Sequence, residues 1–193
     1  MSNIDYLGPL KYLVGNWSGS GFDTSKSGGT VPYFHELILE PIPRLSYSSE
    51  HQVLNSLRFV SKMWASEEAA KLNNFFPVYE ENGYISWVPD KANASVGSIV
   101  KQVSNPRGVS FMAIADSISE NATNVALSCT RDQVPDGGII QAPQLTEIYY
   151  PVVGYTSQWD VNNNELKVSD ATILEIAENE YFHQTDESVL TRY

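Results

Sequence analysis

The chain has 193 residues, of which 42% are hydrophobic and 18% are charged, a balance that is typical of one folded domain and excludes a wholly disordered chain. Twelve lysines and arginines stand against 23 aspartates and glutamates, which gives a net charge of −11. This charge repels phosphate backbones and anionic lipids, so we expect no nucleic acid and no membrane among the partners.

The single cysteine, Cys129, has no partner for an internal disulfide and suits a reducing compartment. The first residues lack the basic start and the apolar stretch of a signal peptide, and no apolar run is long enough to span a bilayer. We therefore expect a cytoplasmic protein in which residues 1–193 form one domain.

The predicted elements are mostly strands, but the first is a short helix over residues 4–14. Its apolar residues Leu7, Leu10, Leu13 and Val14 repeat at spacings of three and four. A helical insertion is expected at 66–73, and an exposed loop at 132–143, which holds two prolines and two glycines. Strands are predicted at 16–23, 32–40, 44–54, 57–64, 84–88, 96–104, 108–116, 123–130, 145–150, 153–161, 165–171 and 181–192.

Many short strands, separated by turn residues such as Asn82-Gly83 and Asn105-Pro106, favour an antiparallel sandwich or barrel. The C-terminal third is the most regular part, and Tyr155, Ser157, Trp159 and Val161 share one face of its first strand. A last strand that pairs back with the first would close the sheet and remove its edges.

Few residues suit chemistry at a metal or cofactor. The motifs of hydrolases, phosphate-binding loops and dinucleotide-binding folds are missing from the sequence. The three histidines, His35, His51 and His183, are the residues suited to soft-metal or heme-iron ligation, and no two have the spacing of a zinc site. For each of them a hydrogen-bonded or surface histidine is the commoner case. We expect Cys129 to be a buried, inert thiol.

Three acidic pairs, Glu67-Glu68, Glu80-Glu81 and Asp186-Glu187, are expected in solvated turns or on opposite faces of strands. Neighbouring residues of a strand point to opposite faces, so such a pair cannot act as one carboxylate dyad.

The most distinctive stretch is Gly15-Asn-Trp17-Ser-Gly19-Ser-Gly21, in which three glycines share one strand face with a tryptophan. Glycine inside a strand marks a sharp bend or a close approach of another part of the chain. A short helix followed by such a strand is also how several small barrels cover one open end.

With this motif in view, the chain resembles the nitrobindin family of heme-binding β-barrels, which look like fatty-acid-binding proteins and other calycins. Four segments carry the resemblance, in order from one end of the chain to the other. They are the helix that leads into the glycine motif, then Pro43-x-Leu45-x-Tyr47, then Trp64 with Pro77-x-Tyr79-x-Glu81-x-Gly83-Tyr84, and finally Leu190-x-Arg192-Tyr193. The resemblance implies a closed antiparallel barrel of about ten strands with the N-terminal helix over one end.

The resemblance also implies a heme b cofactor and, as an activity, heme-dependent isomerisation of peroxynitrite to nitrate. The family's iron ligand is a histidine in the last strand, and His183 is the nearest candidate here. It lies two residues, or roughly 7 Å along a strand, before the expected position, which Thr185 occupies. Tyr79 replaces a family histidine near the pocket, and His51 is a further candidate ligand.

Two alternatives stay open. The barrel could bind another small hydrophobic ligand, such as a fatty acid or a pigment, without iron. Tyr79 and His51 would then be hydrogen-bonding groups of the pocket, and Arg192 a partner for a carboxylate. Alternatively, its own side chains could fill the barrel, which would then serve contact with another protein.

Overall fold

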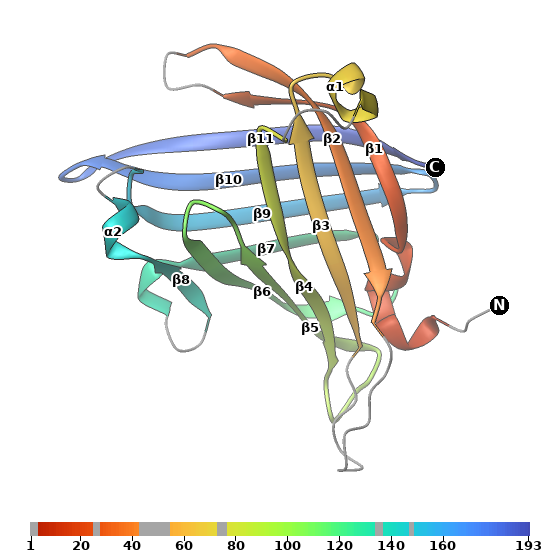
Figure 1. Cartoon of the computed structure of the whole chain (residues 1–193). Coiled ribbons are helices and arrows are strands. Elements are labelled where there is room, and N and C mark those ends of the chain that lie inside the picture. The colour runs from red at the N-terminus through yellow and green to blue at the C-terminus, as the bar shows by residue number, and fades with distance from the viewer. Residues whose placement is uncertain (1–3, 25–27, 43–54, 73–76, 134–136, 147–148) are drawn as a thin grey trace.

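The structure, a computed structural model, describes residues 4–24, 28–42, 55–72, 77–133, 137–146 and 149–193, and its strands form an antiparallel barrel (Figure 1). Buried and exposed residues alternate along strands such as β7, because successive side chains point to opposite faces. The strands are β1 (Gly15–Thr24), β2 (Thr30–Pro41), β3 (Ser56–Trp64), β4 (Tyr79–Pro89), β5 (Val96–Ser104), β6 (Val109–Ser119), β7 (Asn124–Thr130), β8 (Gly138–Gln141), β9 (Val152–Asn162), β10 (Glu165–Ala177) and β11 (Glu180–Arg192).

Two pairings close the barrel. β11 pairs antiparallel with β1 from Trp17–Arg192 to Asp23–Asp186, as the sequence predicts. β5 pairs with β6 and so joins the ends of the strand order β5-β4-β3-β2-β1-β11-β10-β9-β7-β6. The eleventh strand, β8, pairs with β6 outside this ring, which leaves ten strands in the ring. The predicted fold class, a closed antiparallel barrel, is confirmed.

The N-terminal helix differs in detail from the single helix predicted at 4–14. It is a 3₁₀ element, η1 (Asp5–Tyr12), kinked at Gly8, whose φ of 55° is a left-handed value that glycine adopts without strain. A side chain at Gly8 would also overlap the indole of Trp87, since a Cβ there would lie 2.5 Å from its Nε1. The predicted apolar face is nevertheless buried, because Leu7, Leu10 and Leu13 all pack in the core. η1 thus plugs one end of the barrel.

Several other segments correct the predictions. The described residues of the strand expected at 145–150 are not in a strand, because 145–146 belong to α2 (Pro143–Thr146) and 149–150 lie outside any strand. Proline is favoured at a first helical position, where its missing N–H has no acceptor to lose. The expected loop at 132–143 contains β8 and most of a 3₁₀ turn, η2 (Arg131–Gln133).

Two further boundaries differ, and one agrees. Asn82-Gly83 lies inside β4, where both residues pair with β3 and β5, so it is not a turn. β10 also continues beyond the predicted 165–171 to Ala177. The helical insertion predicted at 66–73 is confirmed as α1 (Glu67–Leu72), and the predicted strand at 44–54 lies outside the described residues.

No helix in the described ranges is long and apolar enough to cross a membrane.

Candidate ligand-binding site

A large cavity opens at the end of the barrel opposite η1. Trp17, near the start of β1, donates a hydrogen bond of 2.8 Å from its Nε1 to the Leu13 carbonyl at the η1 end, whereas Asp23, near the end of β1, lines the cavity. The volume of the cavity is about 830 Å³, and the half-exposed rings of Tyr149 and Tyr150 lie at its rim. A cavity of this size is typical of a small-molecule site.

The walls are mainly aromatic and aliphatic, with a few polar groups. Tyr33, Tyr79, Phe111, Tyr155 and Phe182 supply the aromatic surface. The charged side chains on the walls are Asp23, Asp186 and Arg107, and the guanidinium of Arg107 lies over the rings of Tyr79 and Tyr149, 5.3 Å and 5.7 Å from their centroids.

The strand alternation places the glycine motif on this interior. Trp17 and Gly21 are buried on the inner face of β1, and a Cβ at Gly21 would lie 2.5 Å from the ring of Tyr33. The predicted close approach of another part of the chain is therefore present. The bare backbone of Gly21 lets the ring of Tyr33 approach β1 closely at the boundary of the cavity.

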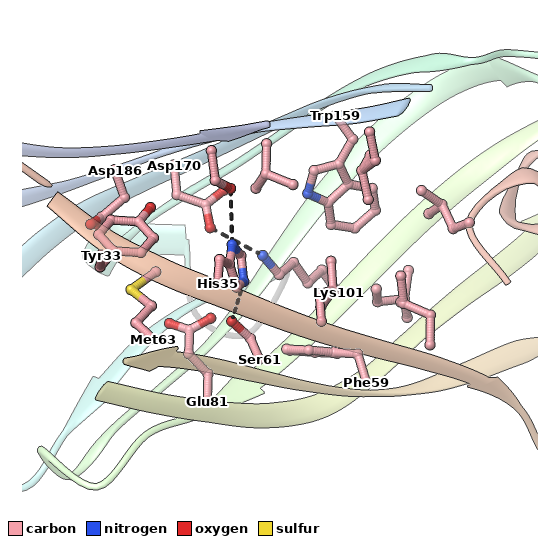
Figure 2. Close-up of a pocket in the computed structure, with 17 residues that line it drawn as sticks. Tyr33, His35, Phe59, Ser61, Met63, Glu81, Lys101, Trp159, Asp170 and Asp186 are labelled. Carbon is pink, nitrogen blue, oxygen red and sulfur yellow. Dashed lines mark hydrogen bonds and ion pairs between the residues drawn. The ribbon is translucent and has the colours of Figure 1, made fainter. Parts of the chain in front are cut away.

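Deeper in the barrel, between the cavity and η1, lies a smaller pocket of about 30 Å³, which we call the inner pocket (Figure 2). It has room for little more than a water molecule. His35 of β2 lies here with 3% of its surface exposed. Its Nδ1 is 2.9 Å from the Ser188 hydroxyl and its Nε2 is 2.9 Å from the Ser61 hydroxyl. Burial lowers the pKa of His35 to about 4, so its ring is neutral at physiological pH.

A buried lysine crosses the same region. Lys101 of β5 donates hydrogen bonds to the hydroxyls of Tyr155, at 2.6 Å, and Ser157, at 3.2 Å. Its ammonium group also lies 3.6 Å from the carboxylate of Asp170. A buried charge is tolerated when it is paired and hydrogen-bonded, and Lys101 meets both conditions.

A second polar group lies on β4, the strand that pairs with β5. Tyr79 donates a hydrogen bond of 2.7 Å to Glu81, and its hydroxyl accepts one of 3.1 Å from Asn105. Burial raises the pKa of both the Glu81 carboxyl and the Tyr79 hydroxyl. Glu80 and Glu81 thus lie on opposite faces of β4, as expected for an acidic pair in a strand, and Glu81 is the buried member of the pair.

Three aspartates lie side by side on neighbouring strands. Asp186 of β11 is directly opposite Asp23 of β1 on one side and Asp170 of β10 on the other. Burial, together with the negative charges of Asp23, Asp170 and Glu81, raises the pKa of Asp186 to about 8. Asp186 lines both the cavity and the inner pocket.

The predicted iron ligand does not lie in this interior. Phe182, Gln184 and Asp186 point into the barrel, so His183 lies on the outer face of β11, where it is exposed. Thr185, two positions later, shares that outer face and contacts the Thr24 hydroxyl at 3.1 Å. The prediction that His183 is an interior ligand therefore disagrees with its position. The position of Thr185, which the resemblance favours, also faces outward, because residues two apart in a strand share a face.

The other predicted site residues, Tyr79, His51 and Arg192, lie in different parts of the chain, and of these Tyr79 is the one that the structure places at the cavity. Tyr79 does line the cavity, as expected. His51 lies outside the described residues. Arg192 lies at the η1 end, where it donates a hydrogen bond of 2.6 Å to the Tyr12 carbonyl and stacks 4.4 Å from a ring of Trp17, so it does not reach the cavity.

Sequence reasoning missed Lys101 and Asp170. Their signal was a charge on an otherwise apolar strand face. Lys101 shares its face with Ile99 and Val103, and Asp170 continues the face of Leu166 and Val168.

The described walls do not fit the iron of a heme. Both ring nitrogens of His35 are occupied by serines in a space too small for a porphyrin, and His183 faces outward. Cys129 is buried in β7, and burial raises the pKa of its thiol to about 11. The pKa values of Tyr33, Tyr79 and Tyr155 are raised as well, which keeps these phenols neutral. The described residues also hold no group of three or more His, Cys, Asp or Glu side chains that could bind a metal ion.

Comparisons with known proteins agree with the fold. The family model of the THAP4-like, heme-binding beta-barrel domain matches residues 6–192. Among solved structures, the chain is similar to the crystal structure of Rv2717c from M. tuberculosis, with a TM-score of 0.65 and 17% sequence identity over 97% of each chain. At this identity the likeness concerns the fold alone. The curated proteins gave no match.

Proposed function

The chain belongs to the family of THAP4-like heme-binding β-barrel domains, and from this premise we propose that its cavity binds a small, largely apolar or aromatic organic ligand that is not held through iron. The observation that carries the proposal is the combination of a cavity of about 830 Å³ with walls that offer aromatic rings and, among the described lining residues, no histidine or cysteine. A barrel of this kind serves as a binding protein and needs no reaction at the site.

The proposal distinguishes this barrel from one that its own side chains fill. The core around η1 is filled by residues such as Leu7, Leu10 and Trp17, all within 1% of full burial. The opposite end keeps its space and exposes Val31, Val78 and Tyr150 at the rim. A ligand that covers this apolar surface would remove it from water, which contributes roughly 25 cal/mol of binding free energy per Å² of apolar surface buried.

Binding of the neutral dye Nile red tests the proposal. We expect saturable fluorescence enhancement with the wild type and at least a tenfold weaker affinity for Leu174→Trp, whose new ring would occupy the cavity. Val189→Trp is the matched control, because Val189 is exposed on the outer face of β11. Equal affinities of the wild type and Leu174→Trp would contradict the proposal. If the wild type binds the dye and Leu174→Trp does not, mass spectrometry of an organic extract of the purified protein would identify the natural ligand.

Heme b is the second candidate ligand, because the family description itself names heme. Peroxynitrite isomerisation would depend on it. Of the three histidines, His51 is the one whose position the described residues leave open. Titration with hemin should therefore compare the wild type with His35→Ala, His51→Ala and His183→Ala. A saturable Soret shift that is lost in His51→Ala or His183→Ala alone would establish heme and its ligand. The proposal expects no saturable shift with the wild type.

A cytoplasmic location and a single ligand-binding domain over residues 1–193 are part of the same proposal. The lone Cys129 supports a reducing compartment, and the barrel uses strands from Gly15 to Arg192.

A further inference from the structure

Among the described residues that line the cavity and the inner pocket, acidic side chains outnumber basic ones. Asp23, Asp186 and Asp170 occupy directly opposed positions on β1, β11 and β10, and all three point inward. Like charges directly opposite each other across strands are destabilising, so such a row needs protons, hydrogen bonds or positive charges nearby.

Two of the three aspartates have partners. Asp170 pairs with Lys101, whose ammonium group lies 3.6 Å from its carboxylate. Asp23 accepts a hydrogen bond of 3.0 Å from the side-chain amide of Gln184, although its other oxygen, Oδ1, is buried without a partner among the described residues. The carboxyl group of Asp186, in the middle, makes no side-chain hydrogen bond or ion pair with any residue in the described ranges, and it faces the cavity.

The surroundings of Asp186 suit a positive ligand. The acidic groups around it are Asp23, Asp170 and Glu81, and the phenol of Tyr33 and the ring of His35 lie on the same walls. The positive groups are Arg107 and Lys101, and Lys101 is already paired with Asp170. Arg107 lies at the turn between β5 and β6, over the rings of Tyr79 and Tyr149. The aromatic walls can also attract a cation through their ring faces. The chain's net charge of −11 would steer cations towards the protein.

We propose that the ligand of this cavity is an organic monocation, such as an aromatic ammonium ion, whose positive group is held by Asp186 and Asp23 while its apolar part lies against the aromatic walls. The inference rests on the proposed function, since it names the ligand class for the same cavity. A bare metal ion fits less well, because the described carboxylates form no metal-binding group and the space of about 830 Å³ is far larger than an ion.

Proton release gives the proposal a distinctive signature. The pKa of Asp186, about 8, leaves its carboxyl mostly protonated at pH 7 in the empty protein. A cation that takes the carboxylate as its counter-ion would displace this proton. We therefore expect release of close to one proton per cation bound at pH 7, and an affinity that rises about tenfold from pH 6 to pH 7. Isothermal titration in two buffers of different ionisation enthalpy measures the released proton.

The decisive experiment uses two probes of the same shape. Phenyltrimethylammonium carries a permanent charge, and tert-butylbenzene is its neutral isostere. Each should be titrated against the wild type by displacement of Nile red. We expect the cation to bind at least tenfold more tightly than the isostere. Asp186→Asn should abolish this preference, whereas Glu187→Gln, the same charge change on the outer face of β11, should keep it.

The outcomes separate the two proposals. If both probes displace the dye and the neutral isostere binds as tightly as the cation, the ligand class is wrong while the cavity remains a binding site. If the wild type does not bind Nile red or either probe, both proposals fail. Since Asn mimics a protonated aspartate, Asp186→Asn should fold, and thermal unfolding of this variant checks that its loss of preference is local. A preference for the cation that survives in Asp186→Asn would also overturn the assignment.

Discussion

The ammonium group of Lys101 on β5 donates a 2.6 Å hydrogen bond to the hydroxyl of Tyr155 on β9. The same group lies 3.6 Å from Asp170 on β10, so one buried positive charge connects three strands across the barrel. The rings of Tyr155 and Trp159 lie 5.2 Å from it, which adds cation–π attraction in a region without bulk water.

Lys101→Met should destabilise the protein strongly. The substitution shortens the unbranched side chain by one atom and leaves the carboxylate of Asp170 without its counter-charge, and breaking a buried pair in this way costs about 3–5 kcal/mol. Urea unfolding, followed by tryptophan fluorescence, measures the loss. The double variant Lys101→Met/Asp170→Asn should recover much of it, because no isolated charge then remains.

Lys167→Met is the control for this pair. Lys167 lies on the outer face of β10 and is exposed, so its loss should change the free energy of unfolding by less than about 1 kcal/mol. A double variant as unstable as Lys101→Met would show that the destabilisation comes from packing and not from the charge of Asp170.

Tyr79→Phe should also destabilise the protein, by about 1–3 kcal/mol, because Glu81 loses its 2.7 Å hydrogen bond while it stays buried. The amide of Asn105 loses its acceptor at the same time. Tyr84→Phe is the matched control on the same strand, since Tyr84 is exposed. Equal free energies of unfolding for the two variants would contradict the assigned role of the Tyr79 hydroxyl.

The barrel itself was predictable because it depends on local patterns. Alternation along 153–161 predicts that Tyr155, Ser157, Trp159 and Val161 face one way, and all four are buried. The pairing of the last strand with the first was also predictable, since both are long and the glycine motif marks a close approach. The effect of a proline on the continuity of a helix is harder to predict from the sequence than the strand pattern. Pro9 lies inside the predicted N-terminal helix, which the structure divides at Gly8.

The site was less predictable, because its residues meet across the barrel. No local pattern indicates that Lys101 faces Asp170, or that His35 lies between Ser61 and Ser188. The outward position of His183 was accessible to the same alternation. Leu190 is buried on the inner face of β11, so residues with even numbers face inward and His183 faces outward. The resemblance favoured a histidine by its place in the sequence, whereas strand parity places that histidine on the outer face.

Gly21→Ala should destabilise the barrel by roughly 1–3 kcal/mol, the usual range for overpacking. Its Cβ would lie 2.5 Å from the ring of Tyr33 and 2.7 Å from the Glu187 carbonyl, and backbone cannot move aside as a flexible side chain can. Ser20→Ala, the neighbouring change on the outer face of β1, should be nearly neutral. Thermal unfolding compares the two variants. A Gly21→Ala protein as stable as the wild type would show that β1 and β2 shift freely.

The dependence of stability on pH should reveal two opposing groups. The pKa of His35 falls from 6.5 to about 4 on folding, so the unfolded chain binds the extra proton between these values and stability rises with pH there. The pKa of Asp186 rises from 3.8 to about 8, so the folded chain binds the extra proton and stability falls with pH over that window. Each slope is about 1.4 kcal/mol per pH unit, and the two cancel between about pH 4 and 6.5.

Single variants should separate these slopes. His35→Gln removes the rising contribution, so its stability should fall relative to that of the wild type as the pH increases from 4 to 6.5. Asp186→Asn removes the falling contribution, so its advantage over the wild type should grow up to about pH 8. His183→Gln is the matched control, because it makes the same change at an exposed histidine on the outer face of β11, away from the buried groups. Urea unfolding at half-unit steps of pH measures all three profiles. The burial of His35 and Asp186 would be contradicted if their variants gave profiles parallel to that of the wild type.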